Sequence, residues 1–403
     1  MKYPYYKSNM IVLGCCIFMA AVSYQLVIPF MPKFLGEMNV EPENISFWTG
    51  LIFSMQALSV VIATPIWGKL GDTYGRKPMI LRAGFVISIM YLALYFCHTP
   101  SQLLLVRFIN GFFTGFIPAS VTLISTNTPK KKVLSYVATA QTLSAAGQII
   151  GPSVGGFLGS THGFRTISVY GAIAVFISTL AVVFFVIERN KPIAEKIEKT
   201  SILEDLKTSV KSPIIKRLMF VNFLQGFCVT GIMPFIVIHL GHMSTDIPSW
   251  FIGTIYSAPA IAMIMTAQIW SKFGKKTSYY MTLTIGIIGS GINILIMANV
   301  GNIWSFALFF LLYGIFNSAV TTNTTAKTVI DIEDNFRGRA LSVQSSCVML
   351  GSVIAPLSSG FISKVYNTEI SFVITGTILL ISGITFFILS KKDIKKELAK
   401  SKI

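Results

Sequence analysis

Charged residues are scarce in this sequence: Asp, Glu, Lys and Arg together make up 12% of its 403 residues. Soluble domains carry about 25% charged residues, so this composition excludes an ordinary soluble fold. Hydrophobic residues make up 53%, which predicts an all-α protein that crosses a membrane many times. The sequence contains neither a phosphate loop nor a nucleophile elbow, so we expect neither nucleotide hydrolysis nor enzymatic activity.

Cysteine and histidine are also few. The cysteines lie in or beside apolar runs without CxxC spacing, at Cys15, Cys16, Cys97, Cys228 and Cys347. We interpret them as small core residues and expect no disulfide framework, metal site or cofactor. The histidines map to the outer side of the topology predicted below, which favours surface positions over a pH-sensing role. They are His98, His162, His239 and His242.

Acidic residues number 16 against 33 basic ones, and none lies in the middle of an apolar run. Runs nearly free of charge predict twelve spans, at roughly 9–32, 45–68, 79–97, 101–123, 134–160, 166–187, 217–239, 249–271, 278–298, 303–326, 340–363 and 370–390. Of the basic residues, 29 flank the spans on the side of both termini, 3 lie opposite, and Arg107 is the one charge that we place within a span. The positive-inside rule therefore puts both termini in the cytoplasm. The net charge of +17 then reflects topology, with no binding to nucleic acid implied.

One long hydrophilic connection divides the chain. Residues 189–216 separate six predicted spans, within residues 1–188, from six more and a basic tail, within residues 217–403. In this connection the run SILE at 201–204 matches a helix capping box, and both an amphipathic surface helix and a plain linker helix fit the pattern. The halves also repeat, since Pro356 follows Pro152 by 356 − 152 = 204 residues in similar glycine-rich surroundings. We predict two six-helix bundles related by pseudo-two-fold symmetry.

A stripe of small residues runs along the fifth predicted span. Glycines recur there every fourth residue, so they share one helix face and let another helix approach the backbone closely. Helix packing alone explains many such stripes, but the complete run GxxxGPxxGGxL at 147–158 is more specific. It resembles the antiporter motif of drug exporters in the major facilitator superfamily. The candidate motif residues are Gly147, Gly151, Pro152, Gly155 and Gly156.

A second motif, GKLGDTYGRKP at 68–78, resembles the signature loop between the second and third spans of that superfamily. Glycines permit a tight turn, and a carboxylate can cap a neighbouring helix N-terminus. The resemblance implies that Asp72 and Arg76 hold the cytoplasmic side shut in the outward-facing state. A charged turn that merely obeys the positive-inside rule is the simpler alternative, and Thr73 departs from the basic residue usual in the family. The candidate gating residues are Gly68, Asp72, Gly75, Arg76 and Lys77.

Arg107 is a candidate for coupling or substrate binding, because a charge within the membrane costs at least a few kcal/mol. It resembles the fourth-span Arg tied to proton coupling in the superfamily, with Asn110 where Gln is commoner. Arg107 cannot release its proton at useful pH, so it would tune a neighbouring acid or bind an anion. Related antiporters often hold an acid in the first span four residues before a proline, where this chain has Gln25, which does not titrate. The remaining candidate proton carriers are Asp72, Glu188, Asp331, Glu333 and Asp334.

The resemblance places the chain with bacterial twelve-span multidrug exporters, closest to fluoroquinolone-type exporters of Gram-positive bacteria through the run 65–84. It implies a secondary transporter in the cell membrane that exports small amphipathic drugs in exchange for protons. We expect it to work as a monomer in the lipid bilayer. The first alternative is a facilitator or exporter of a specific metabolite, such as an anion paired with Arg107, which the missing mid-span acid favours. A non-transporting sensor or scaffold is the second, and the intact pair Asp72 and Arg76 argues against it.

Overall fold

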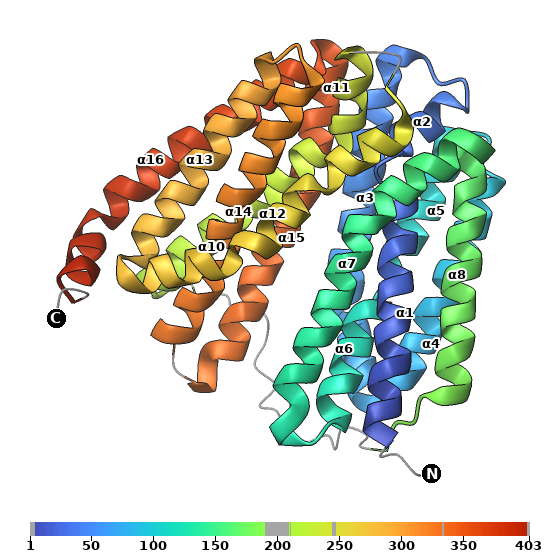
Figure 1. Ribbon diagram of the computed structural model, residues 1–403, viewed down its shortest axis with the longest axis horizontal. Helices are drawn as coiled ribbons and strands as arrows, with labels where there is room; N and C mark the ends of the chain where they lie inside the picture. Colours follow the sequence, from blue (N-terminus) through green and yellow to red (C-terminus); the bar gives the residue numbers. More distant parts are fainter. Residues whose placement is uncertain (1–4, 190–208, 210, 244–246, 333, 401–403) are drawn as a thin grey trace. The chain divides into compact units, whose positions relative to one another are not determined.

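The computed structural model describes residues 5–189, 209, 211–243, 247–332 and 334–400 (Figure 1). Within these ranges every regular element is a helix, so the prediction of an all-α chain is confirmed. The first part of the chain forms α1 (Tyr5–Val27), α2 (Met31–Gly36), α3 (Pro42–Tyr74), α4 (Arg76–Tyr95), α5 (Pro100–Phe112), α6 (Phe116–Asn127), α7 (Lys130–His162) and α8 (Phe164–Phe185). The second part forms α10 (Pro213–Ile232), the 3₁₀ turn η1 (Met233–Phe235), α11 (Ile236–Met243), α12 (Ser249–Lys276), α13 (Tyr279–Asn299), α14 (Ile303–Asp331), α15 (Asp334–Val365) and α16 (Thr368–Lys400).

Eleven helical segments in the described ranges are long and apolar enough to cross a membrane. They correspond to all the predicted spans except the fifth, which is α7. The buried positions of α7 are all Ala, Ser, Gly or Pro. These small residues lower its hydropathy, because the buried face of α7 packs closely on a neighbouring backbone and carries no large apolar side chains.

Contacts divide the chain into two compact units. Unit 1 comprises Met1–Trp48, Met55–Glu198 and Asp246–Ser257. Unit 2 comprises Thr49–Ser54, Lys199–Thr245 and Ala258–Ile403. The predicted division at 189–216 stays a prediction, and most of that connection, including its amphipathic segment, lies outside the described residues.

In unit 1, α1 contacts α6, α7 and α8, and Figure 1 shows α1 between α7 and α8. Leu13 and Ile17 of α1 join one hydrophobic core with Ile80 of α4, Leu123 of α6 and Val182 of α8. Each of these side chains is fully buried. Because lipid is as apolar as this core, tight packing has to hold the helices together where the hydrophobic effect gives little preference.

In unit 2, α10 packs on α15, and α13 packs on both α14 and α16. The two units repeat one local contact. The indole nitrogen of Trp67 donates to the carbonyl oxygen of Phe112 at 2.7 Å, and that of Trp270 donates to the carbonyl oxygen of Ile315 at 2.8 Å. Donor and acceptor are displaced by the same number of residues, 270 − 67 = 203 and 315 − 112 = 203. This contact supports the internal repeat predicted from the sequence.

The fourth predicted span is interrupted. Its helix ends at Phe112 and resumes at Phe116, with Gly115 between them at φ +123°. A break in a membrane helix frees backbone carbonyls, which need partners. The Trp67 indole N–H donates to the carbonyl oxygen of Phe112, and Arg82 Nη2 donates to the carbonyl oxygen of Thr114 at 3.1 Å. The Arg82 guanidinium also stacks on Trp67, 3.4 Å from the ring centroid.

One prediction about charge placement and one about a cysteine are wrong. Arg107 is not the one charge within a span, because Arg82 lies in α4 and Lys327 lies in α14, both inside segments apolar enough to cross a membrane. The predicted span 303–326 stops just before Lys327, and the predicted span 79–97 contains Arg82 but counts it among the flanking charges. Both residues lie within helices, where their side chains have partners. Among the predicted core cysteines four are buried, but Cys15 is exposed.

Candidate functional site

The motif at 68–78 forms the end of α3, a turn at Gly75 and the start of α4. Gly75 has φ +99°, a conformation that residues with side chains avoid. Asp72 and Arg76 form an ion pair across this turn. The Lys77 ammonium donates to two carbonyl oxygens at the end of α8, those of Val183 at 2.9 Å and Val186 at 2.8 Å. The motif therefore ties together α3, α4 and α8 at one end of unit 1, and its role as a gate stays a prediction.

The carboxylate that caps α4 belongs to Glu188, which follows α8. Its Oε1 accepts from the backbone N–H of Arg76 at 2.7 Å, and its Oε2 accepts from that of Lys77 at 2.9 Å. An anion at a helix N-terminus satisfies unpaired donors and interacts favourably with the helix dipole. A Cβ atom at Gly75 would lie 2.8 Å from Glu188 Oε2, so glycine makes room for this carboxylate. No sequence pattern links Glu188 to the motif, and the sequence indicates it only as a candidate proton carrier.

Gly68 is the motif glycine with no close neighbour. A Cβ added to it would meet nothing within 4 Å. Its expected gating contribution therefore has no packing contact to support it in this structure.

The glycine stripe of α7 packs directly on the backbone of α1. A Cβ at Gly147 would lie 2.7 Å from the Phe18 carbonyl oxygen, and one at Gly155 would lie 2.4 Å from that of Leu26. One at Gly151 would lie 2.6 Å from the Cβ of Gln25. A real Cβ atom essentially never lies within 3.0 Å of such a neighbouring atom, so any side chain at these positions would push α1 away.

Pro152 and Gly156 form a second contact face of α7, within the same unit. A Cβ at Gly156 would lie 2.1 Å from the Ser249 carbonyl oxygen, and one at Gly253 would lie 2.1 Å from the Pro152 carbonyl oxygen. The Ser257 hydroxyl donates to the carbonyl oxygen of Ile149 at 2.6 Å. The backbones of α1 and of the first part of α12, Ser249–Ser257, are thus packed against α7 at this motif.

Unit 2 repeats this arrangement. A Cβ at Gly351 would lie 2.4 Å from the Phe223 carbonyl oxygen of α10. One at Gly50, in the stretch of α3 that belongs to unit 2, would lie 2.2 Å from the Pro356 carbonyl oxygen. The echo of the antiporter motif in the sequence is therefore also an echo in packing.

Arg107 lies in α5 and is 1% exposed. Its three guanidinium nitrogens make no hydrogen bond of acceptable geometry with any described residue, although the Tyr91 ring centroid lies 6.0 Å from the guanidinium carbon. In the described part of the chain, the ionisable groups whose charges act on Arg107 are Tyr24, Tyr91 and Cys97, so no carboxylate is among them. A buried cation without an anion is costly, and an anionic ligand would relieve that cost.

Asn110 lies one turn beyond Arg107 on the same face of α5. It is 4% exposed, and its amide nitrogen is buried without a described partner. The structure therefore brings together two of the three predicted coupling or substrate residues, both as hydrogen-bond donors. Gln25 lies instead where α1 meets Gly151, with its Oε1 buried and without a described partner.

A cluster of charged residues that we did not predict lies in unit 2. The Lys327 side chain, 8% exposed, forms ion pairs with Glu397 and with Asp331, the latter at 2.8 Å. Glu397 Oε2 also accepts from the hydroxyl of Ser278, the N-cap of α13, at 2.6 Å. One turn earlier on α16, Asp393 pairs with Arg217 at 2.5 Å. The predicted basic tail is thus the end of α16, held to α10, α13 and α14 by its two acids.

The candidate proton carriers therefore already have partners or have side chains outside the described part of the chain. Asp72 is paired with Arg76, Glu188 caps α4, and Asp331 is paired with Lys327. The side chains of residues 333 and 334 lie outside the described part of the chain. Among the described residues, no group of three or more His, Cys, Asp or Glu side chains could hold a metal ion.

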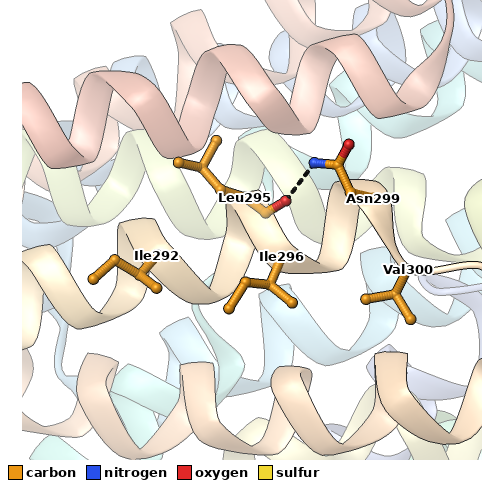
Figure 2. A pocket seen from close by; sticks show the side chains of 5 residues that line it. All are labelled: Ile292, Leu295, Ile296, Asn299 and Val300. Carbon is orange, nitrogen blue, oxygen red and sulfur yellow. Dashed lines mark hydrogen bonds between the residues drawn. The ribbon is translucent and has the colours of Figure 1, made fainter.

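A shallow groove of about 480 Å³ lies along α13, lined by Ile292, Leu295, Ile296, Asn299 and Val300 (Figure 2). The amide of Asn299 is occupied by the carbonyl oxygen of Leu295, to which it donates at 2.8 Å. The lining is therefore almost entirely apolar. It includes none of the predicted site residues, so we do not assign it a role in transport.

Two stretches of the chain, residues 13–323 and 218–402, match the model of the Major Facilitator Superfamily. Together these stretches cover nearly the whole chain, which agrees with its two repeated units of membrane helices. The chain belongs to this superfamily and is a multi-pass membrane transporter.

Its relatives include multidrug efflux pumps. It is 29% identical over 372 residues to the multi-drug resistance efflux pump PmrA of Streptococcus pneumoniae, covering 92% of this chain and 93% of the relative. It is 28% identical over 389 residues to the multidrug resistance protein MdtG of Proteus mirabilis, covering 94% and 96%. Among solved structures, a mutant of the nucleoside transporter NupG matches with a TM-score of 0.82 at 13% identity, over 94% of this chain and 99% of that one. At that identity the match supports the major facilitator fold alone.

Proposed function

We propose that this protein exports amphipathic, lipophilic compounds by alternating access, driven by proton exchange. The observation that carries the proposal is the antiporter motif of α7. Its glycines bring the backbone of α1 within a distance that no side chain would permit, and its Pro152 and Gly156 face a second backbone. The efflux pumps among the relatives of this chain support the same function.

Proton coupling requires a group whose protonation changes the relative stability of the inward-open and outward-open states. The described acidic side chains lie at or near helix ends, and those considered above already have partners. Coupling through an acid would therefore break an existing ion pair or helix cap when the acid is protonated. Such a change would act as a conformational trigger, because it removes an interaction that holds one helix end to another.

A second function is favoured by Arg107. Its guanidinium and the Asn110 amide offer buried donors without described partners, which suits an anionic group. A facilitator or exporter of a small organic anion would use this site without proton exchange.

Inside-out membrane vesicles that contain the protein separate the two functions. We expect a lipophilic dye to accumulate when the vesicle interior is acidified, and we expect a protonophore to abolish this accumulation. Accumulation of a carboxylate-bearing compound that is unaffected by the protonophore would support the anion facilitator and contradict proton exchange. Vesicles without the protein and vesicles with the Gly36→Ala variant serve as controls, because a Cβ at Gly36 meets nothing within 4 Å.

We further propose that both termini lie in the cytoplasm and that the protein acts as a monomer in the cell membrane. The orientation rests on the distribution of Lys and Arg, 29 on one side against 3 on the other. Cysteine labelling with a membrane-impermeant reagent at a terminal position of intact cells tests it, since labelling there would reverse the topology.

A further inference from the structure

His239 is a buried histidine in α11, although the sequence analysis favoured surface positions for all four histidines. It is 2% exposed. Its imidazole packs between the rings of Phe306 of α14 and Phe372 of α16, with centroid distances of 5.3 and 5.2 Å. The other three histidines are exposed, so the prediction is wrong for His239 alone.

Glu369, the second residue of α16, lies beside this ring. Its Oε1 is 3.4 Å from His239 Nδ1, and its side chain is 36% exposed. The carboxylate therefore connects a buried imidazole to water. Neither ring nitrogen makes a hydrogen bond of acceptable geometry with a described residue, although the Glu369 carboxylate and the Met297 backbone both face the ring.

A proton would satisfy this arrangement. A neutral imidazole leaves a buried ring nitrogen without a strong partner, which is unfavourable in an apolar environment. A protonated imidazole carries two donors and a positive charge. Glu369 offers the opposite charge, and the faces of Phe306 and Phe372 attract a cation through their ring quadrupoles.

Few other charges act on this site. In the described part of the chain, the ionisable groups that act on His239 are Glu369 from α16 and His242 from α11 itself. The Met297 backbone of α13 and the apolar side chain of Phe306 of α14 also face the ring. Burial has the largest effect on His239 and disfavours the charged ring, and Glu369 is the main group that favours it.

The pair lies far from the charged cluster around Lys327. Glu369 opens α16 and Glu397 lies close to its end, so 28 residues separate them, or about 42 Å along a helix. The two acids therefore occupy opposite ends of one membrane helix. In the predicted topology the end that carries Glu369 faces the outside of the cell, where protons enter during antiport.

We propose that His239 and Glu369 form a proton-binding site at the outer end of unit 2, and that a proton bound there ties α11 to α16. The coupling of this site to transport rests on the proposed function, but proton binding itself does not. With the proton bound, the ion pair and the aromatic cage hold α11 against the start of α16. When the proton leaves, the pair loses its attraction and α11 is released.

Nuclear magnetic resonance of protein with ¹⁵N-labelled histidine in lipid nanodiscs tests proton binding without any transport. The chain has four histidines, and the His239 signal is the one lost in His239→Gln. We record this signal between about pH 5 and 8, the range in which histidine usually changes its charge, and expect it to shift as the ring gains a proton. In Glu369→Gln, which keeps His239, we expect the midpoint to fall by about one pH unit or more, because an opposite charge nearby favours the protonated ring. His242→Gln is the matched control on the same helix and should leave the midpoint nearly unchanged.

An unchanging His239 signal across this range, or the same midpoint in Glu369→Gln, would overturn the site. Transport measured in the same preparations distinguishes the two proposals. If His239 titrates as expected while a protonophore leaves export intact, proton-driven export is wrong and the proton site stands. If export depends on the proton gradient while His239 does not titrate, the proposed function stands and this site is wrong.

Discussion

Substitution of Gly155 by alanine tests whether α1 and α7 are in backbone contact. The added Cβ would lie 2.4 Å from the Leu26 carbonyl oxygen and 2.8 Å from the Leu26 Cα, where ordinary contacts begin at 3.4 Å. The two helices would therefore have to separate by 3.4 − 2.4 = 1.0 Å at this point. The obstacle is backbone, so no side-chain rotation relieves it.

The expected cost follows from two opposing effects. Overpacking costs about 1–3 kcal/mol, and a clash with backbone belongs in the upper part of this range, about 2–3 kcal/mol, while replacement of glycine by alanine within a helix returns about 1 kcal/mol. We therefore expect a net destabilisation of about 1–2 kcal/mol. At about 2–4 °C per kcal/mol for a unit of this size, the melting temperature should fall by about 2–8 °C.

Thermal unfolding of the purified protein in detergent, followed by tryptophan fluorescence, measures this effect. Gly36→Ala is the matched control, because it adds the same methyl group in unit 1 where nothing lies within 4 Å. Its melting temperature should stay the same or rise by up to about 4 °C, because alanine favours the helix and the added methyl group displaces nothing. If Gly155→Ala unfolds at the same temperature as Gly36→Ala, the close contact of α7 with α1 does not exist and the packing argument for the motif fails.

Three further predictions concern charged residues. Glu188→Gln should lower stability by about 1 kcal/mol in the same melting assay, since it removes the charge that caps α4, and an unchanged melting temperature would contradict the cap. Arg107→Ala should abolish vesicle transport while the protein still inserts into the membrane at normal levels. Arg107→Lys should restore transport only in part, because lysine lacks the planar set of donors. Full activity of the alanine variant would remove Arg107 from the mechanism. Glu397→Gln should destabilise the protein by about 3 kcal/mol, because it removes one of the two acids that pair with Lys327. Adding Lys327→Met to this variant should recover most of the lost stability. A double variant no more stable than Glu397→Gln would show that the two side chains are not coupled.

The membrane spans and the close-packing face of α7 could be predicted because both depend on short stretches of sequence. A charge-free run must lie in lipid wherever it packs, and glycines four residues apart share a helix face in any fold. The break in the fourth span was missed because Gly115 looks like any other glycine of a membrane helix. Its positive φ is sustained by Arg82 and Trp67, which come from other helices.

Charge partners were the part of the candidate site that sequence reasoning could not assign. Lys327 was placed in a loop because a charge usually ends a span, and His239 was placed on the surface because it follows an apolar run. Both are buried, since a carboxylate from α16 meets each of them. Asp72 and Arg76 form an ion pair across the turn at Gly75, and their predicted role in holding the cytoplasmic side shut stays a prediction.

The amino-acid sequence by itself determined that this chain is a polytopic helical transporter with an internal repeat and a close-packed α7. Composition, charge distribution and glycine spacing act locally, so they carry this information without the fold. The tertiary structure alone decided which carboxylate meets which cation or helix end. Glu188 caps a helix whose first residue lies 188 − 76 = 112 positions earlier, and Glu369 meets a histidine 369 − 239 = 130 positions earlier. Such pairs form because packing takes one group out of water and places a carboxylate from a distant part of the chain beside it, a condition that no local pattern records.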